Sequence, residues 1–391
     1  MRPLEGIKVI ELSQVISAPS AGKVLLEMGA EVIKVETSDR GDGWRYTPAV
    51  YSAPVKIDES PIFESLNAGK KFVKLSLKDP EGVKKMQALI SKADVFLTNF
   101  RGKALHGMGI GYEDMKKLNP RLIYATVTGY GDEGPKKDDP GFDNTCYWAE
   151  TGFMRDFCLL GADGTSLPTN APVGGGDTVV GGWIAGGICA ALYEREKTGV
   201  GTYVTVPLFG AGIWAFSQVS IGTQYGYVWP RSYYQMPPTN NPYQTADGDW
   251  IMTSMEKYDE QWPKFCYAFG ADELKEHPIF SKRANTVDLV NRKACVEAIE
   301  AHAKLCHTAD IVDRLKEVDL VFCVMPHMAD VYTNEQAIAN KNIVPYTYNS
   351  GKSVYIPKPP VRFEGYEPLP HTTCPGVGAD TEEVFKEFGI E

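Results

Sequence analysis

The fold is decided by residues 7–36, which read IKVIELSQVISAPSAGKVLLEMGAEVIKVE. The apolar, β-branched run at 7–12 predicts a strand, the pattern at 19–29 predicts a helix, and the run at 30–36 predicts a second strand. Pro19 suits the first turn of that helix, where its missing N–H is not needed. A strand, a helix and a strand in this order predict two parallel strands of an α/β sheet.

The same alternation continues along the chain. Further strand-like runs lie at 72–77, 94–100 and 121–130, and a helical pattern occupies 79–93. We therefore expect a large Rossmann-like domain with a mostly parallel sheet. The turn after its first strand lacks the G-x-G-x-x-G fingerprint of dinucleotide sites, which disfavours a nicotinamide or flavin dehydrogenase.

A change of composition marks the end of this domain. Residues 225–250 are rich in Pro, Tyr, Asn and Gly, and 245–254 have the pattern of a hairpin. We expect a large domain over 1–222, a smaller α+β domain over 223–325, and a C-terminal segment, 326–391, that returns to the large domain.

Composition limits the classes of function. The chain has 391 residues, of which 43% are hydrophobic, and its formal net charge of −10 disfavours nonspecific nucleic-acid binding. An acidic chain can still hold a local basic pocket for an anionic ligand. The N-terminus begins a strand without the pattern of a secretion signal, and we expect no membrane span.

Cysteine and histidine spacing gives no sign of a metal site. The eight cysteines contain no C-x-x-C pair, and the six histidines show no H-E-x-x-H spacing. We expect no bound metal, and free thiols in a chain of this size favour a cytoplasmic location.

One carboxylate stands out in residues 172–182, PVGGGDTVVGG. Asp177 is the only charged residue between Asp163 and Glu194, and the apolar run after it predicts a helix that ends at Gly199. An Asp at a helix start is often simply an N-cap. Here, however, glycines precede Asp177, and four more lie within the helix at positions 181, 182, 186 and 187. These glycines indicate close approach of a ligand or another backbone.

Seven segments together resemble the class III CoA-transferases, the family of formyl-CoA, carnitine and bile-acid CoA-transferases. They are residues 4–36, 41–45, 65–82, 93–105, 128–145, 174–208 and 375–389. The resemblance covers nearly the whole chain. It implies a transferase that uses CoA thioesters as substrates, holds no permanent cofactor and forms a homodimer of interlocked rings.

The resemblance assigns a role to Asp177, which falls on the nucleophile of the family's G-D-x-x-x-G motif. This carboxylate attacks the acyl-CoA to give an aspartyl anhydride and then an aspartyl-CoA thioester. We expect a helix N-terminus to keep Asp177 ionised, and the N–H groups of Gly175 and Gly176 to stabilise oxyanions.

The resemblance also implies a CoA site. Ile16, Ser17 and Ala18 match a backbone segment that lies against the nucleotide, and Asn99, Phe100 and Arg101 match a segment that borders the CoA groove. Four further residues lie near positions that flank the diphosphate or adenine in relatives, namely Lys70, Lys103, Met108 and Lys137. Each of these lysines could equally be a solvated surface charge.

The chain departs from the family pattern in two places. Residues 223–260 lack the glycine run that covers the nucleophile in formyl-CoA transferase, and Gly107 stands where some relatives have arginine. The segments PGFDNTCYWA and TPAVYSAP are most similar to transferases for 2-hydroxy acids such as phenyllactate or 2-hydroxyisocaproate. Five aromatic residues that follow residue 223 could line an apolar substrate pocket, or form core or an interface: Tyr225, Tyr227, Trp229, Tyr233 and Tyr234.

Two alternatives share the fold. A 2-methylacyl-CoA racemase needs the histidine of a G-H-D motif, but this chain has Phe142 there, which cannot transfer a proton. Asp143 is then expected to be a structural hydrogen-bonding residue. A catalytically silent CoA-binding protein is disfavoured because Asp177 and its glycines are intact.

Overall fold

The computed structural model describes residues 2–37, 39–46, 59–158, 165–371 and 373–391. The segment TPAVYSAP at 47–54 therefore lies outside the described residues. Internal contacts divide the chain into two units. Unit 1 comprises Met1–Phe153, Asn170–Ile221 and Tyr332–Glu391, and unit 2 comprises Met154–Thr169 and Gly222–Val331. This division places 154–169 with the smaller unit, whereas the sequence analysis assigned them to the large domain.

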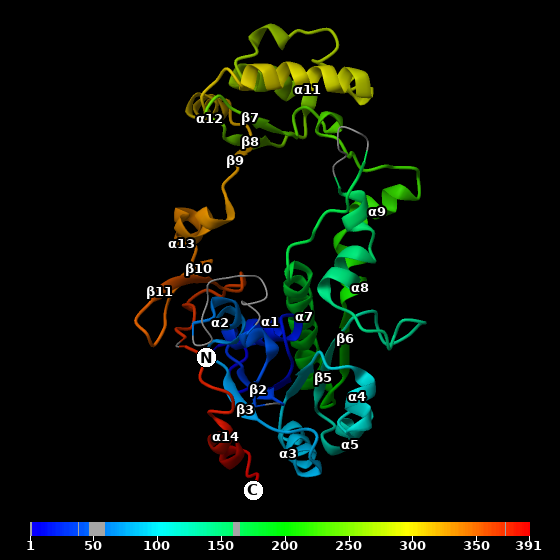
Figure 1. Ribbon diagram of the computed structural model, residues 1–391, viewed down its shortest axis with the longest axis vertical. Coiled ribbons are helices and arrows are strands. Elements are labelled where there is room, and N and C mark those ends of the chain that lie inside the picture. Colours follow the sequence, from blue (N-terminus) through cyan, green and yellow to red (C-terminus); the bar gives the residue numbers. More distant parts are fainter. Residues whose placement is uncertain (1, 38, 47–58, 159–164, 372) are drawn as a thin grey trace. The chain divides into compact units, whose positions relative to one another are not determined.

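Unit 1 is built on a six-stranded sheet in the order β3-β2-β1-β4-β5-β6, with every neighbouring pair parallel (Figure 1). The strands are β1 (Lys8–Leu12), β2 (Glu31–Glu36), β3 (Lys71–Lys74), β4 (Val95–Thr98), β5 (Ile123–Thr128) and β6 (Tyr203–Pro207). The predicted parallel α/β sheet is confirmed. Strand β6 was not among the predicted strands.

Helices connect these strands and continue beyond them. Those of unit 1 are α1 (Ser17–Glu27), α2 (Pro61–Asn67), α3 (Pro80–Ser91), α4 (Gly102–Gly107), α5 (Tyr112–Leu118), α7 (Gly175–Thr198), α8 (Leu208–Ala215), α13 (Glu335–Ala339) and α14 (Thr381–Glu387), with the short helical turns η1 (Gly43–Arg45) and η3 (Asn144–Ala149). Two further helices cross the unit boundaries, α6 (Phe153–Asp156) and α9 (Ser217–Thr223), as does the turn η7 (Met328–Thr333). The predicted helices at 19–29 and 79–93 correspond to α1 and α3.

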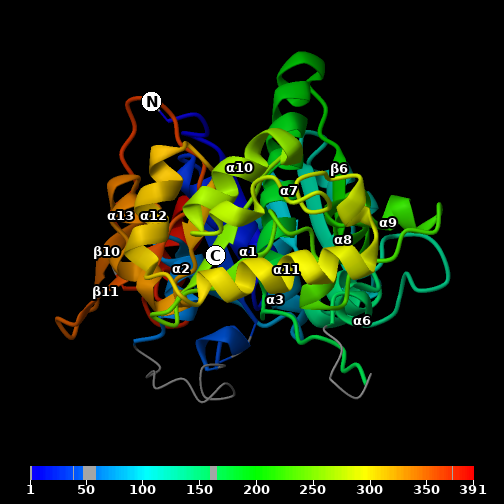
Figure 2. The same cartoon turned by 90° about the horizontal axis from the view of Figure 1, so that it is seen from above.

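Side chains that alternate along each strand bury the two faces of the sheet separately. Val9 of β1 packs into a core with α1 and α7, whereas its neighbour Ile10 packs into a second core with α3 and α14. Because both faces are covered, the strands are apolar almost throughout, as expected for a parallel sheet. The sheet therefore lies between two helical layers. Figure 2 shows α1, α7 and β6 from a second direction.

Helix α7 is long and apolar enough to cross a membrane by length and composition alone, which the sequence analysis did not expect. Half of its most apolar window is buried inside the protein, and α7 packs along α1, so it is a core helix. A Cβ at Gly181 would lie 1.9 Å from the Ser20 Oγ and 3.0 Å from the Ala21 backbone nitrogen. The expected close backbone approach is thus found at this glycine.

Unit 2 has its own core beside a small antiparallel sheet in the order β7-β8-β9. Its elements are β7 (Pro242–Gln244), β8 (Trp250–Thr253), β9 (Phe322–Val324), α10 (Tyr258–Ala268), α11 (Leu289–Ala303), α12 (Thr308–Glu317) and the turns η4 (Tyr233–Gln235), η5 (Asp272–Leu274) and η6 (Asn285–Val287). The strands β7 and β8 form the hairpin expected near 245–254.

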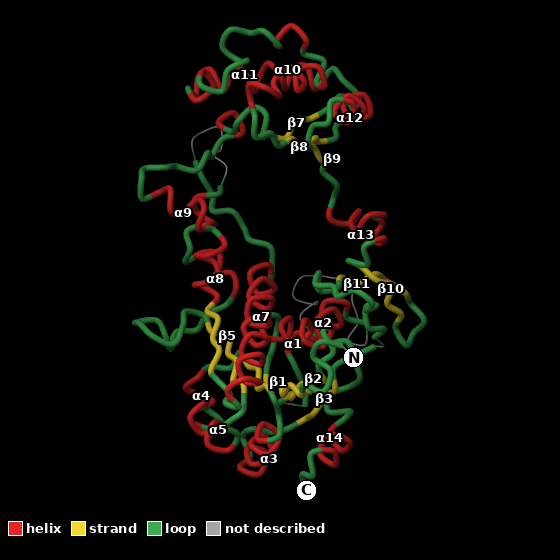
Figure 3. The backbone as a smooth tube through the Cα atoms, turned by 180° about the vertical axis from the view of Figure 1, so that it is seen from behind, coloured by secondary structure: helices red, strands yellow, loops and turns green. Residues whose placement is uncertain are grey.

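The C-terminal segment closes unit 1. Strands β10 (Ile343–Thr347) and β11 (Ser353–Pro357) form an antiparallel pair, and β11 contacts α2. Farther on, the Asp380 carboxylate accepts a hydrogen bond from the Phe72 backbone N–H at 2.7 Å, just before α14. Figure 3 shows this chain end beside the main sheet from behind.

Candidate functional site

A cavity of about 690 Å³ opens in unit 1 at the carboxyl ends of β1, β4 and β5. The chain runs outward from β1 to β3 on one side of the sheet and from β4 to β6 on the other, so the strand order reverses between β1 and β4. Open parallel sheets bind ligands at such a reversal. The cavity is lined by residues 14–17, 99–103, 126–129, 132, 137–139, 141, 142, 177, 203 and 208.

Asp177 lies in the first turn of α7, and its side chain lines this cavity. The N-cap is Gly174, which has a left-handed φ of 73°, so Asp177 is not the N-cap. A Cβ at Gly174 would also lie 2.3 Å from Ile16 Cδ1, so glycine fits there on both counts. The turn thereby brings the start of α7 against the loop that precedes α1.

Asp143 holds this helix start. Its carboxylate accepts hydrogen bonds from the backbone N–H of Gly174 at 3.0 Å, from that of Asp177 at 3.1 Å, and from the Trp148 indole at 3.1 Å. The Gly176 N–H also donates to it. A Cβ at Gly176 would lie 2.3 Å from the Asp143 carboxylate, so this glycine permits the contact. Asp143 thus has the structural hydrogen-bonding role that the sequence analysis expected.

The Asp177 carboxylate is held in an environment that opposes its charge. Burial, followed by the nearby Asp143 carboxylate, raises the pKa of Asp177 to about 7, and a hydrogen bond from the Ser17 side chain opposes this rise. We expected the helix N-terminus to favour the ionised form. Burial outweighs that effect, so the Asp177 carboxyl group keeps its proton to a higher pH than an ordinary aspartate does.

The glycine N–H groups expected to stabilise oxyanions already have partners in this structure. The Gly175 N–H donates to the Pro172 carbonyl at 3.3 Å, and the Gly176 N–H donates to Asp143. An oxyanion role for Gly175 and Gly176 stays a prediction, and it would require these donors to turn from their present acceptors.

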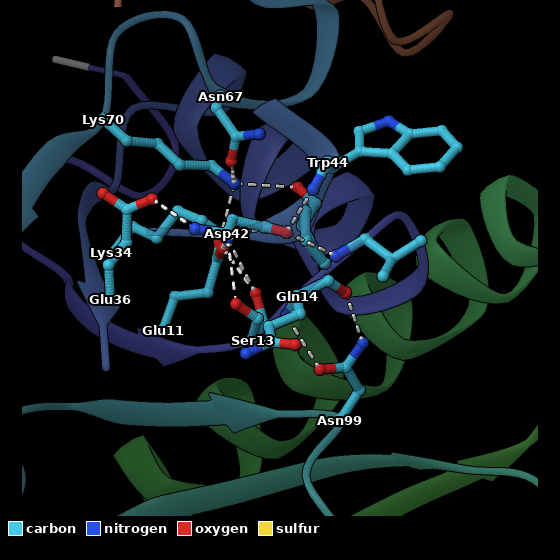
Figure 4. A network of polar contacts seen from close by, with 12 residues as sticks. Glu11, Ser13, Gln14, Lys34, Glu36, Asp42, Trp44, Asn67, Lys70 and Asn99 are labelled. Atoms are coloured by element: carbon cyan, nitrogen blue, oxygen red, sulfur yellow. Dashed lines mark hydrogen bonds and ion pairs between the residues drawn. The ribbon is translucent and has the colours of Figure 1, made fainter. Parts of the chain in front are cut away.

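A network of buried charges lies beneath the loop 13–17, which forms one wall of the cavity (Figure 4). The Lys34 ammonium lies 3.0 Å from the Asp42 carboxylate and 3.2 Å from that of Glu11, and Glu11 in turn lies 2.7 Å from Lys70. All four side chains are fully buried. We call these four residues the charge network.

The charge network fixes the backbone of the loop. Asp42 accepts a hydrogen bond from the Val15 N–H at 3.1 Å, and Val15 adopts a φ of 67°, which is strained for a β-branched residue. From the other side, the Asn99 side chain accepts from the Gln14 N–H at 3.0 Å and donates to the Gln14 carbonyl at 2.7 Å. The loop is therefore clamped from both sides.

The structure brings most of the predicted CoA-site residues together. The cavity is lined by Ile16, Ser17, Asn99, Phe100, Arg101, Lys103 and Lys137, together with Asp177. The three basic side chains are exposed and stand beside Asp132, Asp138 and Asp139, so the cavity carries both signs of charge.

Three predicted residues lie elsewhere. Lys70 belongs to the charge network, and its ammonium also donates to the Pro19 carbonyl and the Asn67 side chain, so it is neither a surface charge nor open to a diphosphate. Ala18 is fully buried in α1, and Met108 packs against the core on the opposite face of the sheet. The sequence around Lys70 does not indicate that a lysine in this turn is buried.

Sequence reasoning missed part of the cavity wall. The Tyr203 hydroxyl hydrogen-bonds Thr126 Oγ1 at 2.8 Å and donates to Asp132 at 3.1 Å. These polar groups sit on the unpredicted strand β6, on β5 and in the loop after β5. A sequence analysis that predicted β6 and placed it beside β5 would have identified these polar groups.

The aromatic residues after position 223 do not form one lining. Tyr225 is 89% exposed, Trp229 stacks on Phe157 with ring centroids 4.3 Å apart, and Tyr233 and Tyr234 pack against the core of unit 2. Core formation, rather than a substrate pocket, therefore explains Tyr233 and Tyr234.

The arrangement suits nucleophilic chemistry on an anionic ligand. A buried carboxylate at the inner end of the cavity can attack an activated carbonyl, and the basic side chains at residues 101, 103 and 137 can hold negative groups. Phe142 lines the cavity and is exposed, and its ring cannot act as an acid or base. This position therefore offers no acid or base for proton exchange at a substrate α-carbon.

Comparison with known proteins agrees with this chemistry. Residues 4–381 match the model of CoA-transferase family III. The chain is similar to (R)-2-hydroxy-4-methylpentanoate CoA-transferase from Clostridioides difficile, with 38% identity over 99% of this chain and 96% of that one. It is similar to cinnamoyl-CoA:phenyllactate CoA-transferase from Clostridium sporogenes, with 33% identity over 98% and 93%. A crystal structure of a CAIB/BAIF family protein from Brucella suis has a TM-score of 0.82, 25% identity and 99% coverage of both chains.

Proposed function

Since this chain belongs to CoA-transferase family III, we propose that it transfers CoA from an acyl-CoA to a 2-hydroxy acid with Asp177 as the covalent nucleophile. The observation that carries the proposal is the position of this one buried carboxylate at the carboxyl edge of the sheet, inside the cavity. Burial there raises its free energy as an anion, which favours attack once the thioester has displaced water.

The reaction proceeds through two anhydrides. The ionised Asp177 attacks the thioester carbonyl, and the bond to sulfur breaks, which releases CoA thiolate and leaves an acyl-aspartyl anhydride. The thiolate then attacks the aspartyl carbonyl and expels the first acid as its carboxylate. The incoming acid repeats these steps in reverse order, so no general base is needed.

The exposed cations at the mouth of the cavity would bind the CoA moiety. Arg101 and Lys103 follow β4, and Lys137 lies in the loop after β5, so three charges converge on one opening. A CoA diphosphate and 3′-phosphate would match them. Asp138 and Asp139 lie close to Lys137 in the chain, so we expect Arg101 to contribute most.

The proposed acid class rests on the relatives and on the cavity wall. The two relatives above act, by their names, on (R)-2-hydroxy-4-methylpentanoate and phenyllactate. The cavity of this chain combines apolar side chains, namely Ile16, Phe142 and Leu208, with the polar side chains of Thr126 and Tyr203. Such a wall would accept an apolar side chain and pair with a 2-hydroxyl group.

The substrate proposal is tested by measuring kcat/KM for a series of acids with one fixed acyl-CoA donor. We expect 2-hydroxyisocaproate and phenyllactate to exceed lactate, and oxalate and carnitine to be poor. The matched pair is phenyllactate against 3-phenylpropionate, which differ only in the 2-hydroxyl. Equal values for that pair, or a preference for oxalate or carnitine, would contradict the 2-hydroxy-acid proposal while leaving the transferase assignment intact.

Self-association is part of the same proposal. One face of α7 and α8 exposes five large apolar side chains, namely Val179, Trp183, Tyr193, Ile213 and Trp214. The Trp183 and Trp214 rings contact edge to face, with centroids 6.4 Å apart. So large an apolar face suits an interface, and a second copy would cover it. Light scattering should give the mass of a dimer, and Trp183→Asp should give a monomer. Free thiols at all eight cysteines suit a cytoplasmic enzyme.

A further inference from the structure

We propose that the Ser17 hydroxyl, oriented by the Asn99 amide, is the donor that holds the reactive carboxylate of Asp177 and stabilises the negative charge that forms on it during transfer. This inference rests on the proposed role of Asp177 as nucleophile. Ser17 is then a catalytic residue, since it touches a reacting group, and Asn99 is a positioning residue that acts through Ser17.

The orientation of the Asn99 amide is fixed by the loop backbone. Its oxygen accepts from the Gln14 N–H at 3.0 Å, and its nitrogen donates to the Gln14 carbonyl at 2.7 Å. A flipped amide would place oxygen against oxygen and N–H against N–H. The second N–H of the same nitrogen therefore points to the Ser17 Oγ, 3.2 Å away.

This contact decides where the Ser17 proton goes. The Asn99 nitrogen can only donate, so it occupies a lone pair of the Ser17 Oγ and leaves the hydroxyl proton free for another acceptor. Ser17 and Asp177 line the same cavity, and the Ser17 side chain is the hydrogen-bonding group that favours the ionised form of the Asp177 carboxylate. The three side chains thus form a chain of donors from Asn99 through Ser17 to Asp177.

The two helices that carry Ser17 and Asp177 are held at a fixed separation. Ser17 is the first residue of α1, and Asp177 lies in the first turn of α7. One turn into α1, the Ser20 Oγ donates to the Ser17 carbonyl at 2.7 Å and lies 3.5 Å from the Asp177 carbonyl. Because α1 and α7 meet here without space between them, the hydroxyl stays within reach of the carboxylate.

The hydroxyl matters most when the thiolate returns. Its sulfur attacks the Asp177 carbonyl of the anhydride and forms a C–S bond, and the π electrons move onto the carbonyl oxygen. That oxygen, which comes from the Asp177 carboxylate, becomes an oxyanion beside the Ser17 proton. The C=O double bond forms again as the C–O bond to the departing acid breaks, which yields the aspartyl-CoA thioester, and the negative charge leaves with the free carboxylate.

A side-chain donor is needed at this oxygen because the nearest backbone donors are engaged. The N–H groups of residues 174, 176 and 177 all donate to Asp143, and that of Gly175 donates to Pro172. A hydrogen bond strengthens as charge concentrates on its acceptor, so the Ser17 donor stabilises the oxyanion more than the starting carboxylate.

The test compares Ser17→Ala with Ser65→Ala, which removes a hydroxyl of α2 that lies outside the cavity and donates to the Ile62 carbonyl. Purified enzyme is mixed with an acyl-CoA in the absence of acceptor, and formation of the aspartyl-CoA adduct is followed by quenched-flow mass spectrometry. We expect Ser17→Ala to slow adduct formation about 10- to 100-fold. Ser65→Ala should stay within about twofold of the wild type, with both variants folded by circular dichroism.

A second readout separates a catalytic role from a structural one. The charged group that faces Asp177 is Asp143, which both variants retain. We expect the rising limb of kcat/KM against pH to move to higher pH in Ser17→Ala, because the donor that favours ionised Asp177 is lost. Asn99→Ala should move it in the same direction, and the double variant should add little to Ser17→Ala.

The outcomes distinguish this inference from the proposed function. If Ser17→Ala forms the adduct at the wild-type rate with an unchanged pH profile, the inference is wrong, although an inactive Asp177→Asn would still support the nucleophile. If Asp177→Asn keeps transfer activity, the proposed function itself fails.

Discussion

Two groups of buried carboxylates in unit 1 differ in how their charge is balanced. In the charge network, burial alone would raise the pKa of Glu11, but attraction by Lys70 and Lys34 lowers it below its ordinary range. Burial would likewise lower the pKa of Lys34, but Asp42 and Glu11 raise it. At Asp177 the charged neighbour is another carboxylate, Asp143, and the pKa rises.

The difference shows how the chain separates structure from reactivity. A buried carboxylate between lysines is stable as an anion and has little tendency to attack anything. A buried carboxylate beside a like charge is less stable as an anion and gains more by forming a covalent bond. The charge network fixes the loop at one side of the cavity, and the unbalanced carboxylate performs the chemistry.

Replacing Asp177 should give the largest effect and separates the two groups most sharply. We expect Asp177→Asn to lower kcat by about 10⁴-fold or more, because a covalent nucleophile is lost. The raised folded pKa means that stability is lost as pH rises from about 4 through about 7, since the ionised form is disfavoured in the folded state. The free energy of unfolding of the variant should therefore be about 4 kcal/mol higher than that of the wild type at pH 8.

Urea denaturation at pH 5 and pH 8 checks this second part. The stability gain should be larger at pH 8, where the wild-type carboxyl is ionised. A variant less stable than the wild type at both pH values would mean that Asp177 is balanced in the same way as Glu11.

Removing a lysine from the charge network should have the opposite effect on stability. We expect Lys34→Met to lower the free energy of unfolding by about 3–5 kcal/mol, because Asp42 and Glu11 would lose a shared buried partner. Lys71→Met, in the neighbouring strand β3, is the matched control. Lys71 pairs with Glu31 and Glu387 at the surface, so its loss should cost about 1 kcal/mol or less. Equal losses in the two variants would show that burial does not distinguish them.

Replacing Arg101, an exposed cation at the mouth of the cavity, tests how much a charge contributes when it lies in solvent instead of the protein interior. We expect Arg101→Ala to raise KM for the acyl-CoA about 10-fold, because an exposed cation is partly screened but meets several ligand charges. Steady-state kinetics at two salt concentrations measure this, and the effect should shrink at high salt. Lys84→Ala, an exposed lysine of α3 outside the cavity, should leave KM unchanged. An unchanged KM in Arg101→Ala would transfer the main phosphate contact to Lys103 or Lys137.

We expect the smallest effect from replacing Asp143, the carboxylate that lies near Asp177. In the wild type we expect kcat/KM to rise with pH through about 7, since Asp177 must be ionised to attack. Asp143→Asn removes the neighbouring charge and also one of the two acceptor oxygens that hold the start of α7. In the folded variant the rising limb should move to lower pH, and activity at pH 6, relative to the variant's own maximum, should fall less steeply than in the wild type. A limb that stays in place would mean that burial alone raises the pKa of Asp177.

Sequence patterns predicted the features that depend on residues close together in the chain. The runs at 7–12 and 30–36 predicted the first two strands, and the isolated Asp177 among glycines predicted a ligand site where the structure has the cavity. The charge network could not be predicted in this way. Glu11, Lys34 and Lys70 lie on three different strands or turns, and only the strand order brings their side chains together.

The same limit explains the error at Lys70 and the limited account of Asp143. A lysine in a polar turn has the pattern of a surface residue, because the pattern does not show that Glu11 lies 2.7 Å away. Asp143 was expected to form hydrogen bonds, but its partners, the first N–H groups of α7, lie 31 or more residues later. Both contacts join residues that lie far apart in the chain, so no short stretch of sequence shows them.

The contact between Ser20 and Gly181 has a mechanical consequence. Two helices that touch through a glycine cannot slide or separate without breaking their packing, so the side of the cavity formed by the starts of α1 and α7 is rigid. The cavity is also lined by residues 137–139, which belong to an exposed run between β5 and η3. We expect this run, rather than the two helices, to adapt to ligands of different length, so exchanging residues 137–139 between relatives should alter the range of acids accepted while the reacting groups keep their spacing.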